Sequence, residues 1–268
     1  DSDRDALVEF MGSLTRGPLG NHCRFALLAA TQTDRDSLRG LGTYGFIRRA
    51  AGFIVGALRP GPRDLEDYGY LMEQAVLAAV DLGLGTCWLG GTFTKSSFAR
   101  RIGVETDETV PTVVATGYPA PTSRRHWIRR SAGSEHRMAP ALLFFEKLPR
   151  GRLQPVRADE FSEVLETVRW APSASNKQPW RLARSGADWH FYLHRTQGYG
   201  QGAIASLIKM ADLQRVDMGI AMCHFDLAAR ERGLSGRWSV AEPDLDVASR
   251  DWEYTATWSA APPKAKTV

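Results

Sequence analysis

The feature that most constrains this chain is a repeat of part of its sequence at a constant offset of 150 residues. At least eight identities fall within 22 positions aligned without a gap, which chance does not readily produce. They include Asp67 and Asp217, Gly69 and Gly219, Leu77-Ala78-Ala79 and Leu227-Ala228-Ala229, Gly83-Leu84 and Gly233-Leu234, and Trp88 and Trp238. A tandem duplication of this kind predicts two related halves, and fused halves resemble a two-fold dimer joined in one chain.

Each copy of the repeat contains one long apolar stretch, "LMEQAVLAAVDLG" or "MGIAMCHFDLAARERG". The stretches are apolar nearly all round, which is typical of helices buried in the middle of a protein. Each ends at a glycine, where a left-handed C-terminal cap is expected. The sequence therefore predicts two long, central, buried helices.

A weaker match precedes the helices, at an offset of about 154, and joins "TRGPLGN" to "VRWAPSASN". Short strand-like runs follow these loops, and a helical pattern precedes the second one. The expected strands are 24–30, 52–58, 112–118 and 189–194, and the expected helix is 158–170. The fold class is thus α+β, with halves at 1–150 and 151–268 that meet in a connector rich in proline and basic residues at 146–157.

Composition excludes several classes of protein. The net charge of +4 over 268 residues is too small to indicate a nucleic-acid partner. Cys23, Cys87 and Cys223 lie far apart, which predicts neither a disulfide framework nor a metal site and fits the reducing cytoplasm. The beginning of the chain is charged, and the most apolar run, 68–89, contains acidic residues, so we expect no signal peptide and no membrane partner.

The stretch "GLGTCWLGGTFTK" at 83–95 is rich in glycine but matches neither common nucleotide-binding motif. A dinucleotide fingerprint needs a third glycine in register after a strand, and a P-loop needs lysine where Gly91 stands. Two interpretations remain. The segment is a turn whose bare backbone approaches a flat polar ring closely, or it is a helix cap followed by a packed tryptophan.

The basic run at 123–137 is expected to be mostly a solvated surface, with one or two arginines able to hold the phosphate of a small molecule. No nucleophile with a general base, no zinc-protease motif and no paired carboxylates are present in the sequence. We therefore expect no catalytic side chain, and predict that a bound cofactor supplies the chemistry.

These motifs together resemble the flavin-dependent nitroreductase family. The resemblance rests on "APSASNKQPWRL", "GLGTCWLGGTF", "PTVVATGYPA" and an arginine shortly before "LLFF", and it extends over residues 14–240. It is strongest to the branch in which two nitroreductase-like halves are fused in one chain. The proline-serine string and the glycine-tryptophan segment are specific in combination, since either alone is only suggestive.

The resemblance implies a nitroreductase-like α+β fold with FMN bound between the halves. It implies an FMN-dependent NAD(P)H oxidoreductase that works by ping-pong hydride transfer through flavin N5 to nitroaromatic, quinone or similar small electrophilic acceptors. Residues of the second half expected to contact the flavin are Pro172, Ser173, Ala174, Asn176 and Gln178. Residues of the first half expected to cover its ring are Trp88, Leu89, Gly90 and Gly91, and Arg137 is expected to hold the phosphate.

Two departures from the family pattern qualify this expectation. The family opens with an Arg-Arg-Ser-x-Arg string, which is absent from the residues that begin at Asp1, so either the chain is trimmed or phosphate binding is weakened. The repeat copies have decayed to "RGPLGN" and "RGLSGRWSV", which predicts one FMN per chain within a single-chain pseudo-dimer.

Two alternatives stay open at the level of sequence. The loop at 171–180 is also consistent with a helix-ending turn whose side chains bond their own backbone. The whole chain is also consistent with a non-catalytic flavin- or ligand-binding remnant of the fold.

Overall fold

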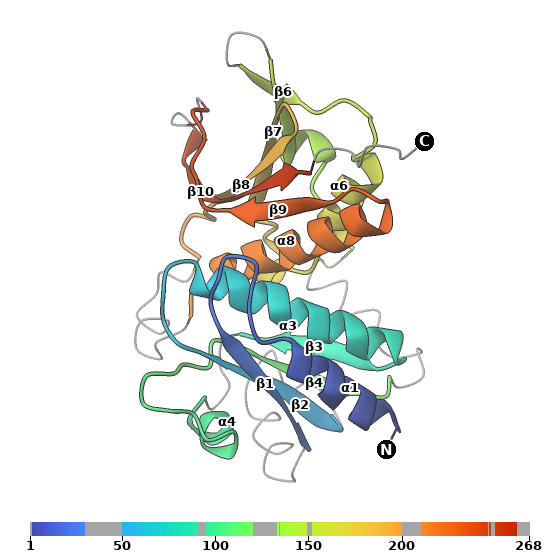
Figure 1. Cartoon of the computed structure of the whole chain (residues 1–268), viewed down its shortest axis with the longest axis vertical. Helices are drawn as coiled ribbons and strands as arrows, with labels where there is room; N and C mark the ends of the chain where they lie inside the picture. The colour runs from blue at the N-terminus through green and yellow to red at the C-terminus, as the bar shows by residue number, and fades with distance from the viewer. Residues whose placement is uncertain are drawn as a thin grey trace, which may run out of the picture.

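A computed structural model describes residues 2–29, 50–90, 95–119, 133, 135–148, 152–199, 211–245, 247 and 250–261. Two long helices, α3 (Asp64–Asp81) and α8 (Leu213–Glu231), lie side by side across the middle of the molecule, between two sheets (Figure 1). This confirms the expected pair of central buried helices. Across the described ranges, no helix is both long and apolar enough to cross a membrane.

The two sheets repeat one strand order. The four-stranded sheet runs β1 (Cys23–Ala29), β2 (Gly52–Leu58), β4 (Val113–Gly117), β3 (Gly85–Leu89). The six-stranded sheet runs β6 (Leu153–Pro155), β5 (Phe144–Lys147), β7 (Trp180–Ser185), β8 (Asp188–His194), β10 (Trp252–Ala260), β9 (Gly236–Ser239). Its last four strands follow the order of the first sheet, with antiparallel pairing throughout both sets. The α+β class is confirmed.

The smaller helices also occupy matching places. In the first half α1 (Ser2–Ser13) packs on α3, and in the second half α6 (Ser162–Trp170) packs on α8. The helix α4 (Lys95–Arg101) and the 3₁₀ turns η3 (Pro140–Leu142) and η4 (Ala174–Asn176) complete the described helices. The order helix, loop, two strands, long helix, strand, strand is therefore common to both halves.

The central helices touch most closely at their paired glycines. A Cβ atom added to Gly69 would lie 2.2 Å from the carbonyl oxygen of Val216, and one added to Gly219 would lie 1.9 Å from that of Glu66. These two contacts are related by the same offset of 150 residues. Any larger residue would force the helices apart, because the obstacle in each case is backbone.

Both central helices end in the same way. Gly83 and Gly233 have φ values of 76° and 74°, and the amides of Leu84 and Leu234 each donate to a carbonyl five residues back at 2.9 Å. This pattern is a Schellman cap, in which glycine adopts the left-handed conformation without strain. The expected glycine caps are confirmed.

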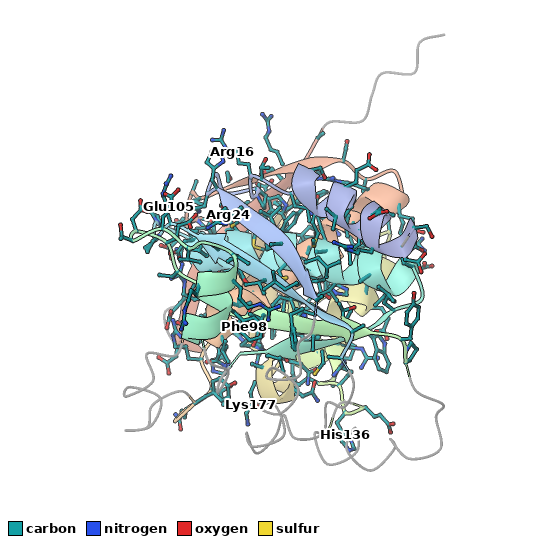
Figure 2. The ribbon with its side chains drawn as sticks, turned by 90° about the horizontal axis from the view of Figure 1, so that it is seen from below. Arg16, Arg24, Phe98, Glu105, His136 and Lys177 are labelled. Carbon is teal, nitrogen blue, oxygen red and sulfur yellow. The ribbon has the colours of Figure 1, made fainter. Side chains whose placement is uncertain are left out.

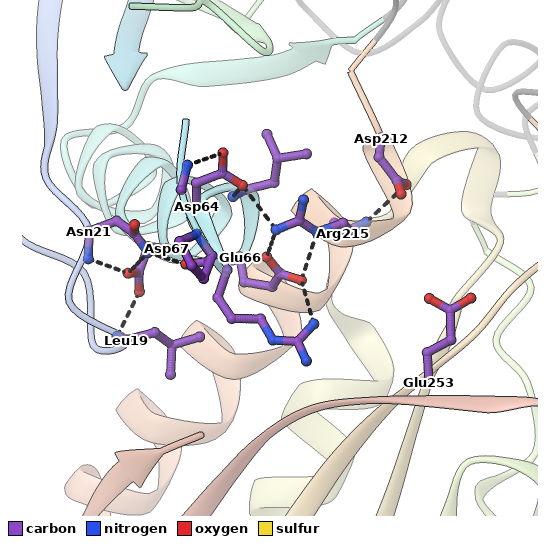
Figure 3. Close-up of polar contacts among 12 residues, drawn as sticks. Leu19, Asn21, Asp64, Glu66, Asp67, Asp212, Arg215 and Glu253 are labelled. Carbon is purple, nitrogen blue, oxygen red and sulfur yellow. Dashed lines mark hydrogen bonds and ion pairs between the residues drawn. The ribbon is translucent and has the colours of Figure 1, made fainter. Parts of the chain in front are cut away.

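The interface between α3 and α8 is less apolar than the sequence pattern indicates. Arg215 donates to both carboxylate oxygens of Glu66, at 3.0 and 2.6 Å, and to Asp64 at 2.9 Å (Figure 3). At a second point of this interface, the Tyr70 hydroxyl donates to Asp226 at 2.5 Å. Buried charges of this kind are stable only when paired, so these contacts fix how the two helices are matched.

Two boundaries differ from the sequence prediction. The expected connector at 146–157 contains the end of β5 and all of β6, which form one side of the second sheet. The helix expected from 158 begins at Ser162, because side chains hold the preceding residues in a turn. The Phe161 amide donates to the Asp159 carboxylate, and the Asp159 amide donates to the Ser162 hydroxyl, both at 2.8 Å. Helix start signals of this type compete with the apolar pattern.

Candidate functional site

The loop at 172–178, called the proline-serine loop below, has an unusual backbone. It follows the last turn of α6, and Ser175, Asn176 and Gln178 have φ values of 51°, 53° and 48°. Residues other than glycine avoid this left-handed region, at a cost of about 1 kcal/mol or more each. Three such residues within four positions persist only because the surroundings hold them, and strain of this kind gathers at functional sites.

The loop is fixed to α8 at one point. The Ala174 amide donates to Oδ1 of Asp217 at 2.9 Å, and within the loop the Gln178 amide donates to the Ser173 hydroxyl at 2.9 Å. Asp217 is almost fully buried, and its Oδ2 has no hydrogen-bond partner in the described part of the chain. Burial raises the pKa of Asp217 well above its usual range.

The amide side chains of the loop bind a segment of the first half, residues 136–138, called the strap below. Asn176 donates from Nδ2 to the carbonyl oxygens of Gly133 and His136, at 2.6 and 2.8 Å. Gln178 accepts the Met138 amide at 2.8 Å. Figure 2 shows His136 and Lys177, the neighbour of Asn176, at the same edge of the molecule. The polar groups of both amides are therefore engaged with the strap.

Arg137, in the middle of the strap, has uncharged partners in the described residues. It donates to Oδ1 of Asn176 and, at 3.1 Å, to the carbonyl oxygen of Trp170, and its guanidinium lies 5.3 Å from the Trp170 ring centre. Among the residues that the structure describes, no carboxylate pairs with it, and its buried Nε has no partner. Burial, and then the nearby Arg169, lowers the pKa of Arg137. Such a group is suited to binding an anion.

The segment expected to form a glycine-rich turn is mostly a strand, because β3 includes Trp88 and Leu89. The Trp88 indole donates to Glu73 on α3 at 3.0 Å, and Glu73 bonds His224 on α8 at 2.9 Å. Leu89 is fully buried. The packed-tryptophan interpretation therefore describes Trp88, whose N–H group is directed at the helices.

Gly90 brings the first half to the start of α8. A Cβ atom at this position would lie 2.7 Å from the side chain of Leu213, one helical turn before Asp217. The end of β3 and the proline-serine loop therefore meet on the same part of α8. Gly91 lies outside the described residues.

The structure brings together most of the predicted site residues but not all of them. Ser173, Ala174, Asn176, Gln178 and Arg137 are joined by the contacts above, with Pro172 just before them. Trp88 and Leu89 point into the core, and Gly90 meets the start of α8 at Leu213. The sequence analysis named Asp217 only as a member of the repeat. Its identity with Asp67 was the signal that could have pointed to a role at the loop.

The counterpart loop in the first half, residues 17–21, is held differently. Asp67 accepts the Leu19 amide on Oδ1 at 2.8 Å, and accepts the amide and the side-chain NH₂ of Asn21 on Oδ2 at 2.8 and 2.9 Å (Figure 3). Both oxygens are satisfied, and Asn21 binds no strap. The two loops occupy equivalent positions, but Asn21 and Asn176 make different contacts.

A cavity of about 540 Å³ opens beside this counterpart loop. It is lined by Leu19, Pro62, Arg63 and Val240, and Arg63 already donates to the carbonyl oxygen of Tyr254 at 2.8 Å. None of these four residues has an unpartnered buried polar atom. We place the candidate site at the proline-serine loop because the unpaired cation and the strained backbone are there.

Comparisons with known proteins agree with the motifs. A family model described as "Putative TM nitroreductase" matches residues 27–229, which is well over half of the chain. The chain belongs to this nitroreductase family. No curated protein matches the sequence.

Solved structures extend the likeness to the fold. A "putative nitroreductase" from Thermotoga maritima is 19% identical, with a TM-score of 0.50, over 96% of this chain and 94% of that one. An FMN complex of a "putative nitroreductase" from Desulfovibrio desulfuricans is 25% identical, with a TM-score of 0.36, over 47% and 79%. The NADPH:FMN oxidoreductase of Vibrio harveyi is 16% identical, with a TM-score of 0.36, over 45% and 60%. The Thermotoga likeness spans both halves and shows the nitroreductase fold.

Proposed function

We propose that this nitroreductase is an FMN-dependent oxidoreductase that takes electrons from NAD(P)H and reduces nitroaromatic, quinone or similar small electrophiles. The observation that carries the proposal is Arg137, a partly buried guanidinium without an acidic partner in the described chain, held against the strained loop of the family motif. A phosphate group would supply both the negative charge and the acceptors that this guanidinium lacks.

The residues present fit FMN. Arg137 would hold the phosphate, while the backbone of Pro172, Ser173 and Ala174 would face the ring, with Gly90 approaching from the first half. When bound, the flavin supplies the hydride and electron transfer. The chain contributes binding, orientation and exclusion of water, and we assign no side chain as an acid or base.

We revise the expected roles of the two amides and the tryptophan. Because Asn176 and Gln178 are saturated by the strap, we infer that they position Arg137 and do not contact the ring directly. Trp88 is held by Glu73 and would fix the end of β3 near the site without covering the flavin.

We also infer that the chain is a tandem duplication that works as a single-chain pseudo-dimer with one FMN. The repeated strand order, the paired glycine contacts and the identical helix caps support the duplication. The halves are 1–150 and 151–268, although β5 lies in the sheet of the second half. The engagement of Asn21 with Asp67 supports a single site, since this asparagine closes its own loop and, in the described structure, does not hold an arginine as Asn176 does.

A visible absorption spectrum of the purified protein tests this proposal. We expect flavin bands that NADH or NADPH bleaches, and a large loss of FMN from Arg137→Ala. Arg24→Ala is the matched control, because Arg24, on β1 of the first sheet, is paired with Glu108. Loss of FMN from the control but not from Arg137→Ala would overturn the assignment.

A second candidate is a ligand carrier or sensor that holds flavin without turnover. It is favoured by the same saturation of Asn176 and Gln178, which leaves the loop without a free amide for a ring. Flavin that binds but is reduced by neither nicotinamide would support this candidate. A colourless protein that cannot be reconstituted with FMN would exclude both.

A further inference from the structure

Asp217 joins α8 to the proline-serine loop through a hydrogen bond, and its surroundings are unlike those of its counterpart. Asp67 accepts three N–H donors on two oxygens, which favour its ionised form and oppose the rise that burial causes in its pKa. Within the described part of the chain, Asp217 accepts one donor, from Ala174, and its second oxygen is buried with no partner. The described residues also place no cation beside it.

This geometry calls for a hydrogen-bond acceptor and not for a charge. An ionised carboxylate buried with one empty oxygen loses its hydration without compensation, whereas a neutral group with one carbonyl-type oxygen satisfies Ala174 equally well. Burial raises the pKa of Asp217, the Ala174 bond opposes this, and Asp212 at the start of the helix adds to it. The direction agrees with the hydrogen-bond pattern.

The position of Asp217 connects this contact to the candidate site. It lies one turn after Leu213, where Gly90 of the first half arrives, and it holds the first residue of η4, just before the left-handed Ser175 and Asn176. Releasing Ala174 would free the strained residues to relax, and Asn176 would lose its placement against the strap. The effect would therefore reach Arg137.

We propose that Asp217 is the positioning residue of the proline-serine loop, and that it acts through the single acceptor Oδ1 without needing its charge. This inference rests on the proposed function for its link to FMN, but the positioning itself does not. It assigns a role that the family motifs leave out, since Asp217 lies in the long helix and outside the loop and the glycine-rich segment.

Three substitutions separate the acceptor from the charge and from the side chain as a whole. Asp217→Asn keeps an oxygen for Ala174 and removes the charge, while Asp217→Ala removes both. Ala174→Pro deletes only the donor. Proline suits this position, because Ala174 begins a 3₁₀ turn and Ser173 before it is extended, with φ −147° and ψ 156°. Asp67→Asn is the matched control on the other half.

The first measurement is amide hydrogen exchange over residues 172–178, which does not depend on FMN. We expect Asp217→Ala and Ala174→Pro to speed exchange in this peptide about tenfold or more, and Asp217→Asn and Asp67→Asn to leave it within about threefold of the parent. Unchanged exchange in both Asp217→Ala and Ala174→Pro would overturn the proposal. Equal loss of protection in Asp217→Asn and Asp217→Ala would show that the charge is required.

The second measurement is the dissociation constant of FMN by flavin fluorescence, with folding checked by circular dichroism. We expect it to rise about tenfold for Asp217→Ala and Ala174→Pro, and to stay within about threefold for Asp217→Asn. If the parent protein binds no FMN, the proposed function fails, while the exchange result still decides the positioning role. If Asp217→Ala does not fold, Ala174→Pro and Asp217→Asn decide it.

Discussion

The loop at 17–21 and the proline-serine loop occupy the same place in the two halves but are held in different ways. In the first half, Asn21 bonds directly to Asp67, and the carboxylate is fully satisfied. In the second half, Asn176 turns to the strap and contacts Arg137, and Asp217 keeps one oxygen unpartnered. Asn21 therefore closes its own loop, whereas Asn176 holds a cation from the other half.

This comparison separates what the repeat preserves from what it does not. The helix crossing and the helix caps are nearly identical in the two halves, because packing and backbone geometry allow few alternatives. The loops differ in hydrogen bonding and in strain, and only the proline-serine loop contains a run of left-handed residues. In the described structure the proline-serine loop combines backbone strain with a buried acid that lacks one partner, and strain of this kind gathers at functional sites.

The helix crossing should respond equally in both halves. Gly69→Ala and Gly219→Ala each place a Cβ atom against backbone, so we expect each to lower the free energy of unfolding by about 3 kcal/mol or more. Gly12→Ala is the control, because its Cβ would meet nothing within 4 Å and alanine favours a helix. Urea denaturation measures all three. A large loss of stability from only one of these two substitutions would contradict an equivalent packing of the two glycines.

The two aspartates should respond in opposite ways to loss of charge. Asp67→Asn puts an NH₂ group against N–H donors, so we expect it to cost about 1–3 kcal/mol of stability. Asp217→Asn removes a buried charge and keeps the acceptor for Ala174, so we expect no loss of stability or a gain. Thermal and urea unfolding test this pair. Equal destabilisation would show that the two acids are in equivalent states.

The two asparagines should separate stability from binding. Asn21→Ala deletes bonds to Asp67 and to the Pro62 carbonyl, and we expect a loss of about 1–2 kcal/mol with unchanged FMN affinity. Asn176→Ala releases the strap, and we expect weaker FMN binding. Unfolding curves and FMN titrations of both variants give the comparison. Equal loss of FMN from Asn21→Ala would contradict a single site.

The smallest expected effect is a pH dependence that belongs to Asp217. Its pKa is raised in the folded protein, so the folded state keeps this proton when the unfolded state has lost it, and stability falls as pH rises above about 4. The Asp217→Asn variant has no carboxyl group at this position and so lacks this fall in stability. Asp67 is present in both proteins and does not contribute to the difference between them. We therefore expect the free energy of unfolding of the variant to rise relative to that of the parent as pH rises toward neutrality. A gap that stays constant from pH 4 to pH 8 would contradict this.

The sequence predicted the parts of the fold that depend on repeated local patterns. The long helices, their glycine ends and the strands at 24–30, 52–58, 112–118 and 189–194 follow from apolar periodicity and capping, and they differ from the structure by a few residues. The edge strand β6 and its neighbour β5 were missed, because a segment rich in proline and arginine looks like a linker until it pairs with a sheet.

The sequence indicated several residues of the candidate site but not the hydrogen bonds that join them. The motif selected Asn176, Gln178 and Arg137, yet nothing in the spacing shows that the two amides bind the strap, because those bonds span about 40 positions of sequence. The partner of Trp88 was likewise hidden, since Glu73 lies inside a stretch that reads as an apolar helix. Long-range polar contacts follow from the packing and cannot be read from local pattern.

The most direct test is the stoichiometry of FMN binding, measured by calorimetric titration of the parent and of Arg137→Ala. Our account predicts one FMN per chain and the loss of that site in the variant, because the only strained loop with an unpaired arginine in the described structure is the one at 172–178. Two equivalent sites per chain, or one site indifferent to Arg137→Ala, would contradict it.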